Sequence, residues 1–548
     1  MRQQTGRVSR ATRRRTTFLA ATALLASLAS GPVFAKALLS THVPEVVAQH
    51  LARAVGVADP NLHLELDVAL PMRDQAGLDA LLQRLYDPAS PLYRHYLSVA
   101  QFTDRFGPTA KDYARLADFL RTSGLTIKGL SANRYMVEVD GTAADIERVF
   151  HVRLNLYQHP TESRTFVAPD REPTLDLDVP VLHVTGLDDF QRATPRVIAP
   201  QNGVKRSKGT GSGPGGDYIG SDMRAAYYGG SALTGQGQSL GLMELEGYNV
   251  ADVQLYFTTV DQPLNVPVNG ISTDGTAVSC TKCNDAEQVL DIEYAISMAP
   301  GLQQVQVYVG KHAESVLNAM ASDNTSKQLS TSWGWRENFA TDDPLFKEMA
   351  AQGQSFLTAS GDYSSLKESG PWPEEDANLT GVGGTDLVTN GAGGSWAAES
   401  GWNDSAGGPS LDKKIKIESY QLPFINKQNQ GSHTLRNVPD IAANSDFDFF
   451  ICHNNKCNGG WAGTSFASPI LAGYVALANE QAANGGGETV GFLNPALYAL
   501  GNRKTYDKDY HDAIGHKSGV YKTVKGFDLV TGLGSPNGQN MIDALVGQ

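Results

Sequence analysis

The chain has 548 residues, enough for several domains, and its apolar (41%) and charged (19%) fractions are typical of a globular protein rather than a disordered one. Its net charge is −13, and arginines gather near the N-terminus, so the remainder is more acidic still. This charge balance argues against a nucleic-acid partner.

Residues 1–35 are predicted to be a signal peptide. A basic Arg13–Arg15 cluster precedes an apolar stretch, Phe18–Ser30, that is too short to span a bilayer, and small residues allow cleavage after Ala35. The arginines loosely resemble a twin-arginine signal, but their spacing favours an ordinary Sec signal. We therefore expect a secreted protein, extracellular or periplasmic, with no membrane helix further along the chain.

Residues 36–195 alternate between strand-like and helix-like patterns. "LHLELDVAL" and "RYMVEVDG" alternate at period two, whereas "AKDYARLADFLRTSG" and "AADIERVF" carry apolar residues at helical spacing. The pattern predicts an α+β domain with mostly antiparallel connections.

Residues 196–217 break this pattern. They are rich in Gly, Pro, Ser and Lys without periodicity, which predicts a linker open to proteolysis. Residues 218–548 then show short apolar runs that end in polar or glycine loops, with helical segments between them. This order predicts a parallel α/β sheet whose functional loops lie at the carboxyl ends of the strands.

The four cysteines form two local pairs, Cys280/Cys283 and Cys452/Cys457. An exported chain permits disulfides, so two short bridges that staple loops are the first interpretation. A zinc site is the alternative, but no Cys/His set with finger-like spacing accompanies the pairs.

The string "GTSFASP" contains a candidate nucleophile, Ser465. Gly463 permits close backbone approach, and the small apolar residues that follow predict a buried helix beginning at Thr464 and Ser465. A serine there lies near the positive helix end and near backbone N–H donors. A helix-capping serine without a catalytic role is the alternative.

A histidine base for Ser465 is not evident. Five histidines follow the linker, and none lies in an H-G-T-H-type segment: His312, His433, His453, His511 and His516. The serine therefore needs another base.

Carboxylates are the candidates for this base. Glu287 and Asp291, in "NDAEQVLDIEYAISMAPG", are four residues apart and share one helical face. The predicted polar side of this helix is Glu293 and Ser297, so the pair points into protein or a cleft, where one pKa should be raised or one proton shared. A third acid, Asp362 of "SFLTASGD", follows a strand; an ordinary turn aspartate is its alternative interpretation.

Together these strings resemble the sedolisin family, the serine-carboxyl peptidases. "MELEGY", "EQVLD", "STSWG", "ASGD" and "GTSFASP" occur in family order, and "SPLYRHYLSVAQFTDRFGP" looks like part of a sedolisin propeptide. The resemblance implies a subtilisin-like parallel sheet flanked by helices over residues 218–548. It also implies an antiparallel, ferredoxin-like α+β propeptide over residues 36–195 that inhibits the enzyme within the same chain.

Carried over by position, the resemblance makes Ser465 the nucleophile and Glu287 its general base. Asp291 would orient and tune Glu287, and Asp362 would be the oxyanion-hole residue. Glu244 of "MELEGY" and Trp333 of "STSWG" match members whose hydrogen-bond network extends further.

Family members also bind one calcium ion near the C-terminus. The resemblance places it on the side chains or carbonyls of Asp512, Ala513, Val524, Gly526 and Asp528, and oxygen ligands of this kind suit Ca²⁺. A glycine is usual in the family where Val524 stands.

These inferences predict a monomeric, self-processing endopeptidase that cleaves protein or peptide substrates at roughly pH 3–5, where a glutamate can act as base and an aspartate can stay protonated. A tripeptidyl exopeptidase on the same scaffold is the main alternative. A catalytically silent binding module is disfavoured because the Ser, Glu and Asp are all present. A lipase or esterase is disfavoured because "GTSFA" is not G-x-S-x-G.

Overall fold

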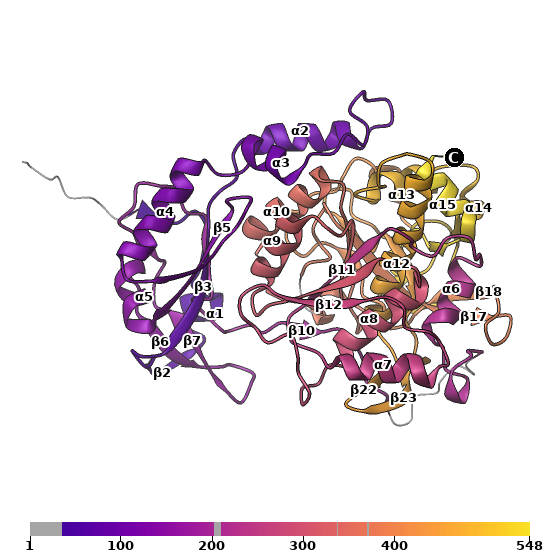
Figure 1. Ribbon diagram of the computed structural model, residues 1–548, viewed down its shortest axis with the longest axis horizontal. Coiled ribbons are helices and arrows are strands. Elements are labelled where there is room, and N and C mark those ends of the chain that lie inside the picture. The colour runs from indigo at the N-terminus through magenta and orange to yellow at the C-terminus, as the bar shows by residue number, and fades with distance from the viewer. Residues whose placement is uncertain (1–35, 202–209, 337, 370–371, 548) are drawn as a thin grey trace, which may run out of the picture.

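The computed structural model describes residues 36–201, 210–336, 338–369 and 372–547, and shows a smaller N-terminal unit beside a larger C-terminal one (Figure 1). The predicted signal peptide lies outside the described residues, as does the middle of the predicted linker. No described helix is long and apolar enough to cross a membrane.

The N-terminal unit is built on an antiparallel sheet. Its strand order is β4 (Thr126–Leu130), β5 (Met136–Thr142), β3 (His63–Ala69) and β9 (His183–Thr185). Helices α4 (Ala110–Thr122) and α5 (Ala143–Phe150) pack their apolar faces on it in one buried cluster. Smaller elements complete the unit: β1 (Lys36–Ala37), α1 (Glu45–Ala48), β2 (Arg53–Val57), β6 (Leu154–Gln158), β7 (Thr165–Pro169) and β8 (Thr174–Leu175). The predicted antiparallel α+β architecture is confirmed.

Two helices of this unit lie against the larger one. Helix α2 (Gln75–Leu85) and α3 (Val99–Arg105) share an apolar cluster with α9 (Ala313–Asp323) and α10 (Phe339–Ala351). Tyr86 Oη between α2 and α3 also donates to the Ala350 carbonyl at 2.7 Å. Apolar side chains of α2 and α3 therefore hold the N-terminal unit against α9 and α10 of the larger unit (Figure 1).

An eight-stranded sheet forms the centre of the larger unit. All of its pairs are parallel except β17–β18. The path is β12 (Val268–Ser272), β13 (Gln304–Val309), β11 (Ser239–Glu244), β14 (Gln328–Thr331), β16 (Ser355–Ala359), β17 (Thr380–Thr389) and β18 (Trp396–Gly401), with β21 (Ile441–Asn444) paired to β17. The central strands are buried on both faces, as their continuous apolar runs predict.

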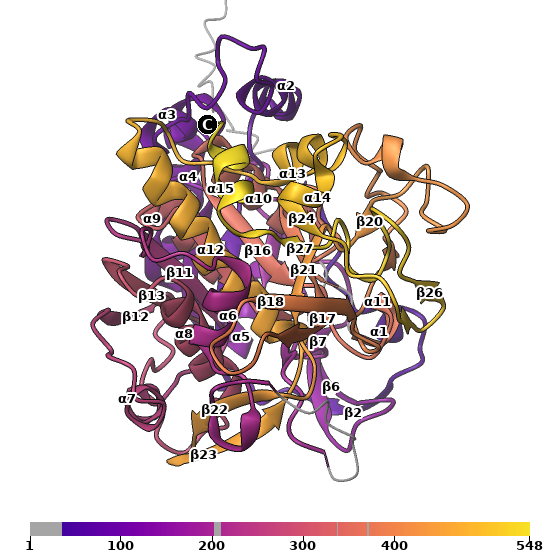
Figure 2. The same cartoon turned by 90° about the vertical axis from the view of Figure 1, so that its right-hand side faces the viewer.

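Two adjacent helices, α8 (Ala286–Met298) and α12 (Thr464–Asn484), pack together on one face of this sheet (Figure 2). Every residue of α8 is buried, because α6 (Gly220–Tyr227) and α7 (Val250–Thr259) cover the side that α12 leaves free. The prediction that Glu293 and Ser297 form a polar outer side was therefore wrong: both are buried.

The remaining elements surround this core. They are β10 (Thr194–Pro195), β15 (Trp333–Gly334), α11 (Leu366–Ser369), β19 (Gly408–Pro409), β20 (Asn437–Val438), β22 (Phe449–His453), β23 (Lys456–Trp461), α13 (Asn494–Gly501), α14 (Tyr506–Asp509), β24 (Tyr510–His511), β25 (Lys517–Ser518), β26 (Tyr521–Lys522), β27 (Ser535–Pro536) and α15 (Gly538–Val546).

Both predicted cysteine pairs are disulfides. Cys452 and Cys457 face each other across the β22–β23 hairpin, and Cys280 pairs with Cys283 in the loop before α8. The zinc alternative is thereby excluded for these four cysteines.

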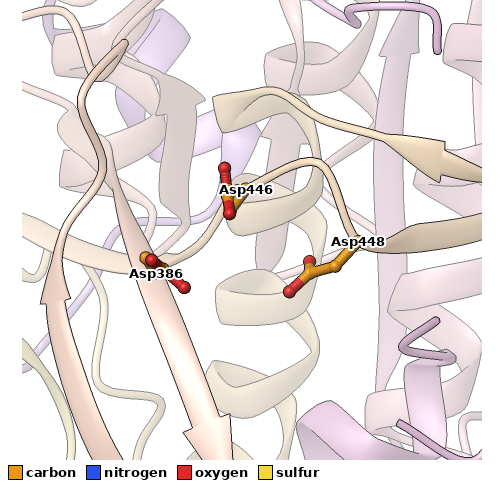
Figure 3. Close-up of side chains that lie close together, drawn as sticks. All are labelled: Asp386, Asp446 and Asp448. Carbon is orange, nitrogen blue, oxygen red and sulfur yellow. The ribbon is translucent and has the colours of Figure 1, made fainter. Parts of the chain in front are cut away.

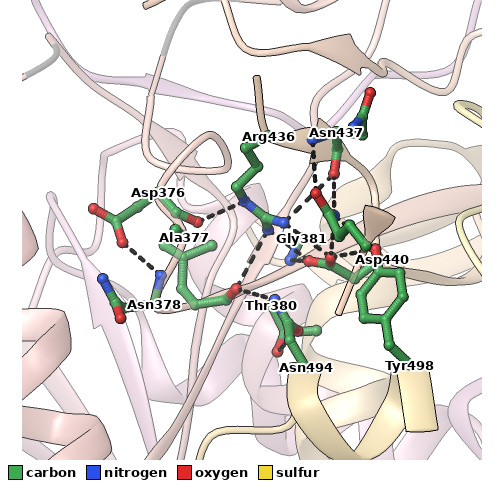
Figure 4. A network of polar contacts seen from close by, with 12 residues as sticks. Asp376, Ala377, Asn378, Thr380, Gly381, Arg436, Asn437, Asp440, Asn494 and Tyr498 are labelled. Carbon is green, nitrogen blue, oxygen red and sulfur yellow. Dashed lines mark hydrogen bonds and ion pairs between the residues drawn. The ribbon is translucent and has the colours of Figure 1, made fainter. Parts of the chain in front are cut away.

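A buried ion pair ties β17, the loop before β21 and α13 together (Figure 4). Both terminal guanidinium nitrogens of Arg436 donate to the Asp440 carboxylate, at 3.0 and 2.6 Å, and Nε donates to the Asp376 carbonyl. Asp440 also accepts from the Gly381 N–H and the Tyr498 hydroxyl. The pair is fully buried, and hydrogen bonds offset the desolvation of both charges.

Candidate active site

Ser465 lies at the first turn of α12, fully buried in the precursor. Gly463 precedes the helix with a φ of 133°, a backbone conformation that side chains disfavour. The helix therefore begins with its free N–H groups and its positive end at the serine, as the sequence predicts.

Glu287 approaches this serine from α8. Burial and the neighbouring Asp291 raise the pKa of Glu287 well above its ordinary value, while the Ser465 hydroxyl and the Val197 N–H lower it. Glu287 Oε2 accepts a hydrogen bond of 2.7 Å from the Val197 N–H. Neither Glu287 Oε1 nor Ser465 Oγ makes a well-directed hydrogen bond among the described residues. The Glu287 carboxyl is thus next to Ser465, and its Oε1 is available to accept a hydrogen bond.

A chain of buried acids continues behind Glu287. The Ser332 hydroxyl donates to Asp291 Oδ1 at 2.7 Å, and the Trp333 indole N–H donates to Glu244 Oε2 at 2.8 Å. Burial raises the pKa of Glu244 to about 8 and that of Asp291 well above its ordinary value, and each of these carboxyls shifts the other. Two such carboxyls hold at least one proton between them at acid or neutral pH.

Asp362, in the loop after β16, contacts the residue next to the serine. Its Oδ1 accepts from both the Thr464 N–H and the Thr464 hydroxyl, at 2.9 and 3.0 Å. Burial raises the pKa of Asp362 to about 7, against the lowering effect of these bonds. Below that pH the group is protonated and can donate a hydrogen bond.

The six residues that the sequence singled out therefore lie in one buried cluster: Ser465, Glu287, Asp291, Asp362, Glu244 and Trp333. Sequence reasoning missed Ser332, which positions Asp291, and Thr464, which positions Asp362. Ser332 lies next to Trp333 in "STSWG", and Thr464 lies next to Ser465 in "GTSFASP". Their positions beside predicted site residues could have identified them.

Three of the five histidines after the linker make contacts outside this cluster. His312 pairs with Asp67 at 3.1 Å, His511 stacks on Trp396, and His516 contacts the Gly401 carbonyl. Glu287, not a histidine, is the titratable neighbour of the serine that the described residues provide.

The chain itself runs through this site. Strand β10 (Thr194–Pro195) pairs antiparallel with β15 (Trp333–Gly334), and Ile198 forms an antiparallel bridge with Ala462. Residues at the start of the predicted linker are therefore buried in the larger unit, because they pair with its backbone.

The predicted calcium residues also lie together. Asp512 Oδ2 accepts from the Gly526 N–H at 3.1 Å, and Asp528 Oδ2 accepts from the Val524 N–H at 2.9 Å, so both carboxyls hold the same loop. Ala513 is buried beside Asp512.

A second acidic group, absent from the sequence predictions, could hold a metal ion. Asp386 of β17 and Asp446 and Asp448 of the loop after β21 each place a carboxylate oxygen within 4.8 Å of the others (Figure 3). Burial raises the pKa of all three carboxyls. No spacing in the sequence marks this group, because one member comes from a different strand.

Comparisons with known proteins agree with this geometry. Residues 51–190 match the family model "Pro-kumamolisin, activation domain". The chain is 29% identical to Kumamolisin of Bacillus sp. (strain MN-32) over 92% of this chain and 96% of that one. It is 27% identical to Sedolisin of Pseudomonas sp. (strain 101), over 85% of this chain and 84% of that one, and 26% identical to Tripeptidyl-peptidase sed5 of Aspergillus fumigatus, over 86% and 92%.

A solved structure shows the same fold. Pseudomonas sedolisin, a serine-carboxyl proteinase, superposes with a TM-score of 0.53 at 24% identity, over 60% of this chain and 98% of that one. The subtilisin-like parallel sheet expected from the sequence is confirmed. With its match to an activation-domain model and its cluster of serine, glutamate and aspartate, the chain is similar over most of its length to serine-carboxyl peptidases of the sedolisin family.

Proposed function

We propose that the protein is a secreted, acid-acting endopeptidase made as a self-processing zymogen, with Ser465 as nucleophile and Glu287 as general base. The observation that carries the proposal is the position of Glu287. It neighbours the Ser465 hydroxyl and also accepts a hydrogen bond from an N–H of the chain in the cleft. A group that takes a proton from the nucleophile and gives it to a leaving amine needs both contacts.

The other buried groups would have supporting roles. Asp291, held by Ser332 and sharing a proton with Glu244, limits the charge around Glu287 and fixes its orientation. Asp362, held by Thr464, donates to the oxygen of the tetrahedral intermediate while protonated. Trp333 fixes Glu244.

The pH dependence follows from these assignments. Activity needs Glu287 ionised, which sets the acid limb, and Asp362 protonated, which sets the alkaline limb near its pKa of about 7. In the precursor, burial and Asp291 raise the pKa of Glu287 well above its ordinary value, and the hydrogen bond from Val197 and the contact with Ser465 oppose that rise. The alkaline limb set by Asp362 places the window of activity below about pH 7.

We assign residues 36–195 to the inhibitory propeptide, 196–217 to the processing region and 218–548 to the peptidase. Three ion pairs support a role for acid in activation, because they join the two units through carboxylates. They are His312–Asp67 at 3.1 Å, Arg336–Asp188 at 2.8 Å and Lys347–Asp79 at 2.9 Å. Burial raises the pKa of Asp188, so acid protonates this carboxyl and removes its attraction to Arg336.

Calcium would be bound by the carboxylates of Asp512 and Asp528 with the carbonyls of Ala513, Val524 and Gly526. The fit is chemical: all are oxygen donors, and buried Asp528, whose pKa is raised by burial to about 7, is a charge that a cation would stabilise. The ion would stabilise the C-terminal segment. The Asp386, Asp446 and Asp448 group is the second candidate position.

Endopeptidase activity is favoured over tripeptidyl activity by the strand in the cleft. It enters through β10 and continues to Ile198, so the site accepts a chain that extends in both directions. Product lengths from a peptide with a blocked N-terminus separate the two activities: internal cleavage supports the proposal, and failure to cleave blocked peptides contradicts it.

The catalytic assignment is tested with the purified precursor from about pH 3 to about pH 8. Loss of the propeptide and cleavage of an unstructured protein should occur in acid and be abolished in Ser465→Ala and Glu287→Gln. Glu293→Gln is the matched control, because it removes another buried carboxyl from α8. Activity that survives Glu287→Gln, or a neutral optimum, would show that the base lies elsewhere.

A further inference from the structure

The chain in the cleft has the backbone contacts of a substrate. The Arg196 N–H donates to the Ser332 carbonyl at 3.1 Å, which continues the antiparallel pairing of β10 with β15. On the other side, Ile198 and Ala462 exchange two backbone hydrogen bonds, of 2.8 and 3.1 Å. The Arg196–Val197 bond therefore lies between two points at which the chain is hydrogen-bonded to the backbone of the peptidase, one at Ser332 and one at Ala462.

The Arg196 carbonyl lies beside Gly463, the glycine that precedes the Ser465 helix. A Cβ added to Gly463 would lie 2.7 Å from the Arg196 carbonyl oxygen and 3.1 Å from Asp362 Oδ2. Both oxygens thus converge on the glycine that opens the Ser465 helix. The Arg196 carbonyl and the Asp362 carboxyl therefore both lie against Gly463, two residues before Ser465.

The nitrogen on the other side of the same peptide bond is the Val197 N–H, which donates to Glu287 Oε2 at 2.7 Å. It is the atom that must receive a proton when the Arg196–Val197 bond breaks. A carbonyl beside Gly463 and a nitrogen that donates to Glu287 single out this bond among those that the structure describes in the linker region, residues 196–201 and 210–217.

The Arg196 side chain fills a buried pocket. One terminal nitrogen, Nη2, donates to Glu374 Oε2 at 2.7 Å and to the Trp372 carbonyl at 3.1 Å. The ion pair is buried on both sides, at 2% and 0% exposure. A Cβ on Gly334 would lie 2.8 Å from Nη2, so the glycine makes room for the guanidinium.

We propose that Arg196–Val197 is the bond this site cleaves in its own chain, and that Glu374 makes the mature enzyme select arginine on the N-terminal side of the cleaved bond. The inference rests on the proposed function and adds its processing site and its substrate class. Arginine leaves with the propeptide after cleavage, and the pocket of Glu374, Trp372 and Gly334 then receives an arginine from another chain.

The reaction balances with the groups described. Ser465 Oγ bonds to the Arg196 carbonyl carbon and loses its proton to Glu287. Glu287 passes that proton to the Val197 nitrogen as the C–N bond breaks, which leaves an ester between Arg196 and Ser465. Water then attacks the ester, its proton returns through Glu287 to Ser465 Oγ, and Arg196 leaves with a free carboxyl group.

The first test is the N-terminus of the mature chain after incubation of the precursor in acid. We expect Val197. Arg196→Gln should slow cleavage at this bond about tenfold or more, because the pocket loses the guanidinium that donates to Glu374 and to the Trp372 carbonyl. Arg192→Gln, four residues earlier and exposed, is the matched control and should be processed normally.

The outcomes separate the two proposals. Cleavage that requires Ser465 but occurs elsewhere, for example after Arg206, would overturn the processing site and leave the proposed function standing. Processing of Ser465→Ala at the wild-type rate would overturn the proposed function itself.

The second test uses peptides of residues 193–200 with either arginine or its neutral isostere citrulline at the position of Arg196. Mature wild-type enzyme should show a kcat/KM about tenfold or more higher for arginine, and Glu374→Gln should lose that preference while still cleaving the citrulline peptide. Glu375→Gln, whose carboxyl accepts from the Leu411 N–H instead, is the matched control. Should Glu374→Gln fail to fold, equal kcat/KM values for the two peptides with wild-type enzyme would overturn the specificity.

Discussion

Two arginines of this protein are buried against carboxylates, and they differ in how completely they are bonded. Arg436 uses Nε, Nη1 and Nη2, and its partner Asp440 is bonded by three further groups of the larger unit (Figure 4). Arg196 bonds through Nη2 alone, while its Nε and Nη1 and Glu374 Oε1 have no hydrogen-bond partner among the described residues.

The difference separates a structural ion pair from a binding pocket. A permanent pair can have every polar atom satisfied within the fold, because neither partner leaves. A pocket that releases its arginine has to keep its carboxylate folded without it. Glu374 meets this requirement, since burial raises its pKa to about 7 and it can become neutral when the guanidinium is absent.

The largest expected effect comes from breaking the complete pair. Arg436→Met should lower the free energy of unfolding by about 3–5 kcal/mol, because Asp440 is left as a buried charge without its cation. Urea unfolding of the Ser465→Ala precursor, which is not processed, measures it. A loss below about 1 kcal/mol would show that the pair is not structural.

Narrowing the pocket should affect arginine substrates next. A methyl group in Gly334→Ala would lie within 2.8 Å of the guanidinium, so kcat/KM for the arginine peptide should fall by about tenfold or more. A peptide with alanine at that position serves as the internal control and should be cleaved at the wild-type rate. Equal losses for both peptides would mean that Gly334 does not line the arginine pocket.

The incomplete pair should contribute little to stability. Arg196→Met in the Ser465→Ala precursor should cost about 1 kcal/mol or less at pH 5, because this pH is below the pKa of about 7 of Glu374 and the carboxyl already holds its proton there. Urea unfolding of both variants, Arg196→Met and Arg436→Met, under the same conditions compares the two losses in free energy of unfolding directly. Similar losses for both variants would break the distinction between the two pairs.

The smallest expected effect is on pH dependence. The pKa of Glu374 is raised by burial, lowered by Arg196 and raised by Glu375, so the ionised fraction grows as pH rises towards about 7. The ratio of kcat/KM for the arginine and citrulline peptides should therefore increase severalfold from about pH 4 to about pH 6. Glu374→Gln should show a flat ratio; a wild-type ratio that falls with pH would contradict the account.

Much of the catalytic cluster could be predicted because its parts are local. Glu287 and Asp291 share a helix face by spacing, and Ser465 follows a glycine at a helix start, so short strings were enough. The position of Arg196 in the active site could not be predicted. The sequence around it has the composition of a loop, and its position is set by backbone pairing of residues 196 and 198 with Ser332 and Ala462, which are distant in the sequence.

Contacts between segments that are distant in the sequence also explain the prediction about α8 that was wrong and the acidic group that was not predicted. The helix pattern of α8 suggested one polar side, but α6 and α7 cover Glu293 and Ser297, and burial of this kind depends on elements that spacing does not reveal. The Asp386, Asp446 and Asp448 group likewise forms only when β17 and the loop after β21 come together.

In the proposed reaction the precursor already holds its own Arg196–Val197 bond at Ser465 and Glu287, before any cleavage has taken place. This arrangement is tested most directly by the initial rate at which the Val197 N-terminus appears in acid, measured over a roughly hundredfold range of precursor concentration. Cleavage within one chain predicts the same first-order rate constant at every concentration. A rate constant that rises in proportion to concentration would contradict it, because the bond would then be cut by another molecule.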